Sequence, residues 1–236
     1  MLVDYKAASV LGIELALALE KQIIFGDLPG GMHLTEEVVS KTAGVSRSPV
    51  REAMRVLEQS GLVVREPRRG VRIPLLTAEE MDDLYTCRLP LERLVAELAT
   101  KNATLSDIAE IQARQEACEN LFKMGNIRAH FEANLEMSAA LLRATHSPTL
   151  IRTVSSLTKH AARYRFQIYD TRRFREYSVM GGAQLVQLLK QRDIEGAVKA
   201  TERMLLTAWP IIRQRLSKLQ ETVNGDAATE HLIRLS

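Results

Sequence analysis

The chain has 236 residues, of which 46% are hydrophobic, 26% are charged and only 5% are aromatic. This length suggests two domains, and the composition is that of a globular protein rich in helix-forming residues. The formal net charge of +3 is too small to identify a nucleic-acid-binding protein by itself. The sequence has no uncharged apolar run of about 18 residues and no secretory signal, so we expect a cytoplasmic protein that does not enter a membrane.

The sequence also lacks the common signatures of catalysis and of metal binding by cysteine. Cys87 and Cys118 are far apart and form no CxxC pair. We therefore expect two ordinary buried thiols rather than a disulfide framework or a zinc cluster. A nucleophile elbow, a phosphate-binding loop and an HExxH motif are all missing, which argues against an enzyme and predicts no cofactor.

Residues 1–74 have the layout of a winged helix-turn-helix domain. Apolar residues recur with helical spacing from about residue 9 to residue 25, and a Gly- and Pro-rich stretch ends that helix. Thr35 is suited to cap a short second helix, with Gly44 in its C-terminal turn. Ser46 or Ser48 is suited to cap a third helix that runs to about residue 60. The run "LVVREPRRGVRIP" then predicts a small β-hairpin wing.

Residues 75–222 are expected to form a second domain, an all-α antiparallel bundle, so the fold class is mainly α. Thr77, followed three residues later by Glu80, predicts a capping box at the start of its first helix. The apolar periodicity predicts helices at about 78–101, 105–123, 127–145, 148–169, 172–191 and 193–220. The tail, residues 223–236, loses this periodicity, and we expect it to be loosely ordered.

The third predicted helix has one arginine face and one apolar face. Arg47, Arg51 and Arg55 recur every four residues, so they share a side of the helix. The opposite side carries the apolar residues Val50, Ala53, Met54 and Leu57. A solvated charged face is the simpler interpretation of such a stripe. However, residues 45–73 hold seven arginines and three glutamates, which gives this segment a formal charge of +4.

An arginine face behind a tight turn is suited to the major groove of DNA, where guanidinium groups bind guanine O6 and N7. Arg68 and Arg69, at the predicted wing tip beside Gly70, are suited to phosphates or the minor groove. The stretch "GVSRSPVREAMRVLEQSGLV" and the flanking residues, about 9–73, resemble the DNA-binding domain of GntR-family transcriptional regulators, whose hallmark is a "VSRTPVREAL" recognition helix. The resemblance implies DNA contacts from Ser46, Arg47, Ser48, Arg51, Arg69 and Gly70.

Residues 78–220 resemble the FCD-type helical effector domain of the FadR-like subgroup, through "YTCRLPLERLVAELAT" and "FEANLEMSAALLRATHSPTL". Many members of that subgroup hold a divalent metal through an Asp and a His one turn apart and two later histidines. The corresponding positions in this chain are Asn134, Ser138, Gly182 and Met204. None of them is a histidine or a carboxylate. The resemblance therefore implies a metal-free pocket, unless His130 or His160 rebuilds a site.

Without a metal, an anionic effector needs another positive partner. The resemblance implies that Arg88 faces the cavity, where it can bind a carboxylate in a bidentate manner. The alternative is a simple helix pair with Glu92, worth roughly 0.3–0.5 kcal/mol. The further candidates for the pocket lining are Tyr85, Asn134, Ser138, Arg163 and Met204.

Together these patterns predict a homodimeric regulator that binds a palindromic double-stranded operator and responds to a small, carboxylate-bearing metabolite. The resemblance implies a repressor, since repression is the usual mode of that family. Two alternatives stay open at this point. One is a constitutive DNA-binding protein with a vestigial pocket, and the other, less favoured, is an all-α enzyme. The identity of the effector and the operator does not follow from the sequence.

Overall fold

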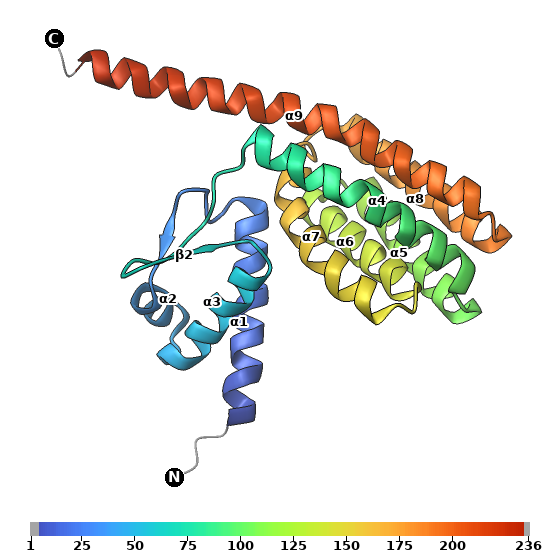
Figure 1. Cartoon of the computed structure of the whole chain (residues 1–236), viewed down its shortest axis with the longest axis horizontal. Helices are drawn as coiled ribbons and strands as arrows, with labels where there is room; N and C mark the ends of the chain where they lie inside the picture. The colour runs from blue at the N-terminus through green and yellow to red at the C-terminus, as the bar shows by residue number, and fades with distance from the viewer. Residues whose placement is uncertain (1–4, 234–236) are drawn as a thin grey trace. The chain divides into compact units, whose positions relative to one another are not determined.

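The computed structural model describes the backbone of residues 5–233 and the side chains of residues 10–219. The chain forms two compact units: residues 1–75 with 156–163, and residues 76–155 with 164–236. Figure 1 shows the first as a small mixed unit and the second as a set of helices. Within the described residues, no helix is long and apolar enough to cross a membrane.

The N-terminal unit has the predicted order of helices followed by a hairpin. Its helices are α1 (Tyr5–Phe25), α2 (Glu36–Ala43) and α3 (Arg47–Gln59), and its strands are β1 (His33–Leu34), β2 (Val64–Glu66) and β3 (Gly70–Arg72). The sheet is antiparallel with the order β1-β3-β2, so β3 pairs with both other strands. The hairpin β2–β3 is the predicted wing. Strand β1 was not predicted, because two residues are too short to show an alternating pattern.

One apolar core holds this unit together. The face of α3 opposite the arginines packs into it, with Val50, Ala53 and Leu57 fully buried. Ile23 of α1 and Val71 of β3 belong to the same cluster. The periodic apolar residues of the sequence therefore fix which side of α3 faces inward and which faces solvent.

The turn between α2 and α3 is built as the sequence predicts. The Thr35 hydroxyl accepts a hydrogen bond from the Val38 amide at 3.2 Å, which caps α2. Gly44 ends α2 with φ of 66°, a left-handed conformation that glycine adopts without steric cost. Ser46 precedes α3 in the capping position, but its side chain makes no capping hydrogen bond.

The C-terminal unit is all helical in its described residues, as predicted. Its helices are α4 (Ala78–Asn102), α5 (Leu105–Lys123), α6 (Ile127–Arg143), α7 (Pro148–Phe166), α8 (Arg172–Gln191) and α9 (Ile194–Ile233). Helix α9 lies along α4, and α5 packs between α6 and α8 (Figure 1). The middle of α7, residues 156–163, groups with the N-terminal unit instead. The predicted two-domain division at residue 74 did not include this segment.

Small differences from the predicted elements have local causes. Thr77 caps α4 through the Glu80 amide at 3.1 Å, but the Glu80 carboxylate accepts from the Tyr164 hydroxyl instead of closing the predicted capping box. A complete capping box forms at Thr104 and Asp107. Of the two cysteines, Cys118 is buried and Cys87 is exposed, so the expectation of two buried thiols is wrong for Cys87.

Helix α9 also extends beyond its predicted end near residue 220. It continues to Ile233, within the segment 223–236 that was expected to be loosely ordered. Residues 234–236 and all side chains after residue 219 lie outside the described residues.

Candidate nucleic-acid interface and effector site

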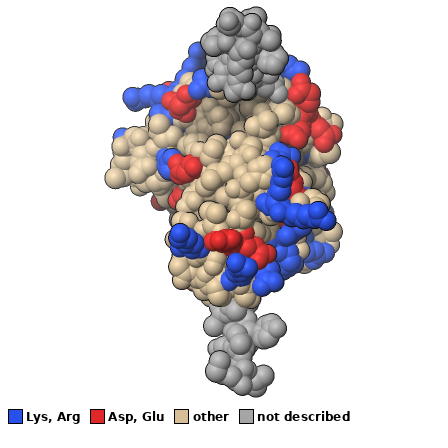
Figure 2. All heavy atoms as spheres, turned by 90° about the vertical axis from the view of Figure 1, so that its left-hand side faces the viewer, with Lys and Arg blue, Asp and Glu red and all other residues tan. Residues whose placement is uncertain are grey.

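The arginine face of α3 is exposed along its whole length. Arg47, Arg51 and Arg55 are exposed, and so are Ser46 and Ser48 at the N-terminal end of the helix. Figure 2, which looks at the side of β2 and α2, shows Lys and Arg side chains mainly toward one edge of that side, with acidic side chains beside them. The predicted arginine stripe is therefore exposed to solvent. Ion pairs with neighbouring acidic residues determine which of these arginines are free to bind DNA.

Acidic partners occupy several of these arginines. Arg55 binds Glu52 of the same helix, with Nη2 and Oε1 2.7 Å apart. This hydrogen bond lowers the pKa of Glu52 and raises the pKa of Arg55. In the same way Arg65 pairs with Glu58, and Arg72 with Glu66. Exposed pairs of this kind contribute only about 0–1 kcal/mol, so they restrict the side chains more than they stabilise the fold.

The remaining arginines are freer. Arg51 reaches Glu36 only at 3.5 Å and keeps 65% of its side chain exposed. Among the described residues, Arg47, Arg68 and Arg69 make no ion pair, and all three are exposed. Among the described residues of the unit, the most available arginines are therefore at the start of α3 and at the tip of the wing.

The N-terminal end of α3 offers further donors. Because the first amides of a helix lack intrahelical acceptors and Ser46 does not cap them through its side chain, they are suited to bind an anion such as a phosphate. The exposed hydroxyl groups of Ser46 and Ser48 stand beside these amides. This end of the helix thus combines a positive side chain, hydroxyl groups and backbone donors.

The tip of the wing has an unusual backbone. Arg68 has φ of 67° and Gly70 has φ of 84°, both in the left-handed region. A Cβ atom on Gly70 would lie 2.4 Å from the carbonyl oxygen of Leu34 in β1. The resemblance implies a DNA contact at Gly70, and the structure adds a second reason for glycine here, because a side chain would collide with β1 where β3 passes close to it. The left-handed conformation of Arg68 has a small steric cost, because its Cβ atom lies close to the backbone.

A buried polar cluster lies inside the C-terminal unit. Its members form two groups: Tyr85, Arg88 and Glu92 of α4, and Asn134, Arg165, Tyr169 and Ser178 from α6, α7, the turn after α7 and α8. We call this set the polar cluster. Buried polar groups need hydrogen-bond partners, so the pairing inside the cluster shows what it lacks.

Arg88 is the most deeply buried charge of the cluster. Its side chain is 6% exposed, and Nη2 donates to Oε1 of Glu92 at 2.6 Å. Its guanidinium carbon lies 5.2 Å from the ring centre of Tyr85. Burial alone would lower the pKa of Arg88, but Glu92 and Tyr85 outweigh it and raise that pKa. The predicted helix pair exists, yet Nε and Nη1 of Arg88 are buried without a partner.

Asn134 and Arg165 form the second part of the cluster. The Asn134 Oδ1 atom accepts a hydrogen bond from Arg165 Nη2, and its Nδ2 donates to Ser178 Oγ at 3.2 Å. Tyr169 Oη lies 3.3 Å from the same Ser178 hydroxyl. Arg165 also lies over the Phe131 ring, at 5.7 Å from its centre. Asn134 is thus a structural hub of the cluster rather than an open ligand.

The other sequence candidates lie elsewhere or serve local structure. Ser138 Oγ donates to the Asn134 carbonyl at 3.0 Å within α6. Met204 lies against Gly181 of α8, with its Sδ 2.8 Å from the position of a Cβ there. Arg163 is buried, but it donates to the Pro74 carbonyl at 2.9 Å and lies in the part of α7 that groups with the N-terminal unit. The contacts thus join Arg88 with Tyr85, and separately Asn134 with Arg165 and Ser178, and Arg163 belongs to neither group.

The residues at the family's metal positions do not fit a divalent cation. Asn134 already uses its oxygen for Arg165, and a side chain at Gly182 would meet Gln115 Oε1 at 2.2 Å. The described residues contain no group of three or more His, Cys, Asp or Glu side chains that could hold a metal. The donor set is therefore an amide, a hydroxyl and a thioether, which bind such cations poorly.

His130 and His160 do not rebuild that site together. His130 is 1% exposed, and its ring packs between Phe122 and Tyr169 with neither nitrogen bonded. Burial, and to a lesser extent the charge of Arg175, lower its pKa to about 4. His160 instead faces Gly61 of the N-terminal unit, 3.4 Å from the position of a Cβ there. His130 and His160 thus lie in different units of the chain, and His130 is buried without a hydrogen-bond partner.

Sequence reasoning missed three members of the cluster, namely Arg165, Tyr169 and Ser178. Their partners lie on other helices, so no local spacing connects them. The one available signal was composition, because "HAARYRFQIY" places arginines and aromatic residues together at the end of α7. Such mixtures are common on surfaces as well, and the signal alone does not identify a site.

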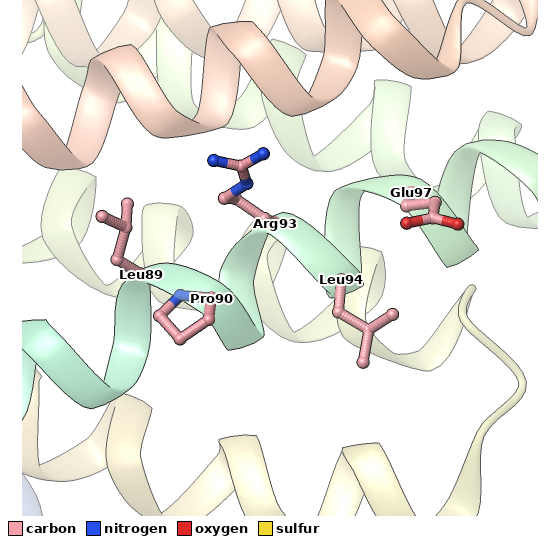
Figure 3. A pocket seen from close by; sticks show the side chains of 5 residues that line it. All are labelled: Leu89, Pro90, Arg93, Leu94 and Glu97. Atoms are coloured by element: carbon pink, nitrogen blue, oxygen red, sulfur yellow. The ribbon is translucent and has the colours of Figure 1, made fainter.

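A shallow pocket of about 480 Å³ lies on the exposed side of α4 and is separate from the polar cluster. Its lining residues are Leu89, Pro90, Arg93, Leu94 and Glu97 (Figure 3). Arg93 points toward α9 and pairs with Glu202 at 3.1 Å. None of the predicted effector residues lines this pocket.

Comparison with known families assigns both units. Residues 12–73 match the family described as bacterial regulatory proteins, gntR family, and residues 83–207, more than half of the chain, match the FCD domain. An uncharacterized HTH-type transcriptional regulator of Bacillus subtilis, YdhC, is 38% identical over 107 residues, which span 45% of this chain and 48% of that protein. The HTH-type transcriptional regulator McbR of Escherichia coli is 24% identical over 181 residues, or 75% of this chain and 81% of McbR.

Solved structures share the fold. That of McbR from E. coli has a TM-score of 0.77 at 22% identity and covers 87% of this chain and 98% of its own. A GntR regulator from Rhodococcus sp. RHA1 has a TM-score of 0.71 at 23% identity, with 85% and 96% covered. The gluconate operon repressor of B. subtilis is 36% identical over 90 residues, 38% of this chain and 37% of the repressor. The chain therefore belongs to the gntR family of bacterial regulatory proteins, with an FCD domain as its C-terminal part, and is a transcriptional regulator.

Proposed function

We propose that this regulator is a repressor that binds a palindromic operator as a homodimer. Its affinity for the operator changes when a small carboxylate effector binds the FCD domain. One observation supports the DNA-binding part of this proposal. Arg47, which makes no ion pair among the described residues, and Arg51, whose pair with Glu36 is 3.5 Å long, lie at the exposed N-terminal end of α3. The hydroxyl groups of Ser46 and Ser48 and the first backbone amides of the helix lie at the same end. This is the part of a recognition helix that contacts bases and phosphates in the major groove.

The wing supplies a second contact region from the same unit. Arg68 and Arg69 are exposed at the turn between β2 and β3 and carry no ion pair among the described residues. Their charges suit phosphate or minor-groove contacts beside the recognition helix. Two basic elements on one small unit favour a duplex over a single charged ligand. As part of this proposal, we expect the protein to bind chromosomal DNA in the cytoplasm and to catalyse no reaction.

The effector half of the proposal rests on Arg88. Its Nε and Nη1 atoms are buried without partners, and burying a charged donor unbonded is costly. Each of these two donors can bond one oxygen of an anion, whereas the two-oxygen contact of a guanidinium needs Nη2 together with Nε or Nη1, and Nη2 already donates to Glu92. A ligand that prefers one spacing of the two DNA-binding units shifts operator affinity by its differential binding.

The first experiment is selection from a randomised duplex library with the purified protein, followed by binding to the enriched site over a range of salt. We expect a palindrome and a steep salt dependence. The test variant is Arg51→Ala, which should weaken the enriched site by about 1–3 kcal/mol, or about 5- to 150-fold. Arg152→Ala is the matched control, because Arg152 is exposed and belongs to α7 of the C-terminal unit rather than to the recognition helix.

The result distinguishes the alternatives. Recovery of no sequence, with salt-dependent retention alone, would replace the repressor with a non-specific DNA-binding protein. Enrichment of a single half-site would contradict the homodimer. A specific site whose affinity no carboxylate changes would leave a constitutive binder with a vestigial pocket.

A further inference from the structure

The hairpin of the wing carries one acidic residue among its basic ones. Residues 64–72 contain four arginines and a single glutamate, Glu66. Glu66 is the last residue of β2, immediately before the turn that carries the exposed Arg68 and Arg69. A carboxylate beside DNA phosphates weakens binding by like-charge repulsion, so its charge alone does not suit this place. The contacts of Glu66 indicate what it does instead.

The Glu66 side chain ties together all three strands of the sheet. Its Oε2 atom lies 2.8 Å from Nε2 of His33 in β1, and its Oε1 atom accepts a hydrogen bond from Nε of Arg72 in β3 at 2.6 Å. Because the strand order is β1-β3-β2, the Glu66 side chain has to reach across β3 to contact His33. We call the three side chains of His33, Glu66 and Arg72 the wing clamp.

The wing clamp lies on the outer face of the sheet. His33 and Arg72 are direct partners in the pairing of β1 with β3. Val71, the residue before Arg72, is fully buried in the apolar core, so Arg72 faces away from that core. The three clamp side chains are between 27% and 39% exposed. The clamp is therefore a surface interaction that the apolar core does not hold in place.

The clamp is joined directly to the tip of the wing. The backbone carbonyl of Glu66 accepts a hydrogen bond from the Arg69 amide at 3.1 Å, which closes the turn between β2 and β3. Strands β2 and β3 have three residues each, and β1 has two. Hairpins this short are marginally stable on their own. The orientation of the tip therefore depends on contacts such as those of Glu66.

The charge of Glu66 persists near neutral pH. Hydrogen bonds from Arg72 and from His33 lower the pKa of Glu66, so it is a carboxylate throughout the range in which histidine side chains usually titrate. A neutral His33 with its proton on Nε2 can donate to this carboxylate, and a protonated His33 adds a charge attraction to the same hydrogen bond. Among the described residues, the charged groups at His33 are Glu66, in direct contact, and Arg72, its partner in the next strand.

The clamp is also close enough to the tip for DNA to act on its charges. Arg72, the strand partner of His33, is two residues along β3 from Gly70, which begins the strand after the turn. Two residues of a strand span about 7 Å, which is less than the Debye length of about 8 Å at physiological ionic strength. A protonated His33 thus places a further positive charge within reach of phosphates bound at the tip.

From these contacts we propose that Glu66 is a positioning residue for DNA binding. Held by His33 and Arg72, it fixes the tip of the wing in the orientation in which the tip arginines contact DNA. Protonation of His33 strengthens the clamp and adds a positive charge, so operator affinity rises as the pH falls. This inference rests on the DNA-binding part of the proposed function and adds to it a residue and a pH dependence.

The first test shortens the clamp without changing its charge. Glu66→Asp keeps the carboxylate but removes the methylene group that the side chain needs to bridge both partners. We expect it to bind the selected operator about 3- to 10-fold more weakly, with a shallower salt dependence, because phosphate contacts of the tip arginines are lost. Glu58→Asp is the matched control, since Glu58 pairs with Arg65 alone, and should bind as the wild type does.

The second test removes the titrating group and leaves Glu66 in place. The wild type should bind the operator about 2- to 10-fold more tightly at about pH 6 than at about pH 8, at constant salt. His33→Gln keeps a side-chain donor for Glu66, so it should match the wild type at the higher pH and lose the gain at the lower one. His146→Gln is the control, because His146 binds Asp107 in the C-terminal unit.

The outcomes separate the clamp from the proposed function. Operator binding by Glu66→Asp equal to that of the wild type would overturn the positioning role. A wild-type affinity that is constant over this pH range, or a pH dependence that His33→Gln retains in full, would overturn the role of His33. Each of these results presupposes that the wild type selects a palindrome. Failure of that selection would instead refute the proposed function itself.

Discussion

The two units of this protein use arginine in opposite ways. In the N-terminal unit the arginines are exposed, and their acidic partners, such as Glu52 for Arg55, are exposed or half-buried neighbours. In the C-terminal unit Arg88 is buried beside Glu92, and Arg165 is held by an amide and an aromatic ring. The exposed arginines of the N-terminal unit can exchange one acidic partner for another at little cost, because water solvates their charges throughout. Such an exchange is difficult in the C-terminal unit, where an unpaired buried charge is costly.

The difference teaches what each surface can recognise. A polyanion such as DNA can displace weak surface pairs and gather several arginines at once. A buried guanidinium instead accepts one small anion of the right shape, because its surroundings do not rearrange. Variants of the buried arginines should therefore change stability and ligand response, and variants of the exposed arginines should change DNA binding alone.

Loss of Glu92 should have the largest effect on stability. In Glu92→Ala the buried Arg88 loses its counter-ion, and breaking a buried pair from one side costs about 3–5 kcal/mol. Urea unfolding should show a lower midpoint with an unchanged m-value. Glu195→Ala is the control, since Glu195 pairs with Lys199 on the surface with 79% of its side chain exposed. A loss below about 1 kcal/mol for Glu92→Ala would mean that Arg88 is solvated in the folded protein.

His130 should make the stability of the C-terminal unit depend on pH. Its pKa is lowered to about 4 in the folded state, while an unfolded histidine titrates near 6.5. The unfolded state therefore binds the proton first as the pH falls, so stability falls between about pH 6.5 and pH 4, by up to about 3 kcal/mol. The charge that faces the ring is Arg175, from α8, and it acts in the same direction.

His130→Phe should flatten this part of the pH profile, because phenylalanine fills the same aromatic surroundings without a titrating group. Denaturant unfolding at a series of pH values measures the difference. His146→Phe is the comparison, since His146 is half exposed and bonds Asp107 on the surface. Parallel profiles for wild type and His130→Phe would show that His130 titrates normally and reaches water.

Gly70 should be the most sensitive position of the wing. Gly70→Ala places a Cβ atom 2.4 Å from the Leu34 carbonyl oxygen and forces φ of 84° on a residue that disfavours it. We expect a loss of about 2 kcal/mol or more in the free energy of unfolding. Gly44→Ala separates the two causes, since Gly44 has φ of 66° but nothing within 4 Å of its Cβ position, and should lose only about 1 kcal/mol. Equal losses would show that β1 moves away at little cost.

The N-terminal unit could be predicted from the sequence largely because its signals are local. Val50, Ala53 and Leu57 recur at helical spacing, and the structure buries all three. The polar cluster was harder, because Arg165 meets Asn134 across 31 residues and Asn134 meets Ser178 across 44. Such contacts follow from how helices pack and leave no periodic trace. Even Gly70 shows this limit: its turn was predictable, but its contact with Leu34 was not.

The smallest expected effect is a difference in operator affinity between variants of two exposed arginines, Arg47 and Arg55. Arg47 makes no ion pair among the described residues, whereas Arg55 is tied to Glu52 by two hydrogen bonds of 2.7 and 3.1 Å. Arg47→Ala should therefore weaken specific operator binding by about 1–3 kcal/mol, and Arg55→Ala by less than about 1 kcal/mol. Neither should change Tm appreciably, because both side chains are exposed. Titration of the selected operator duplex with both variants measures the difference. If Arg55→Ala were the weaker binder, DNA would have to displace Glu52, and the pairs seen on the free surface would not predict the contacts in the complex.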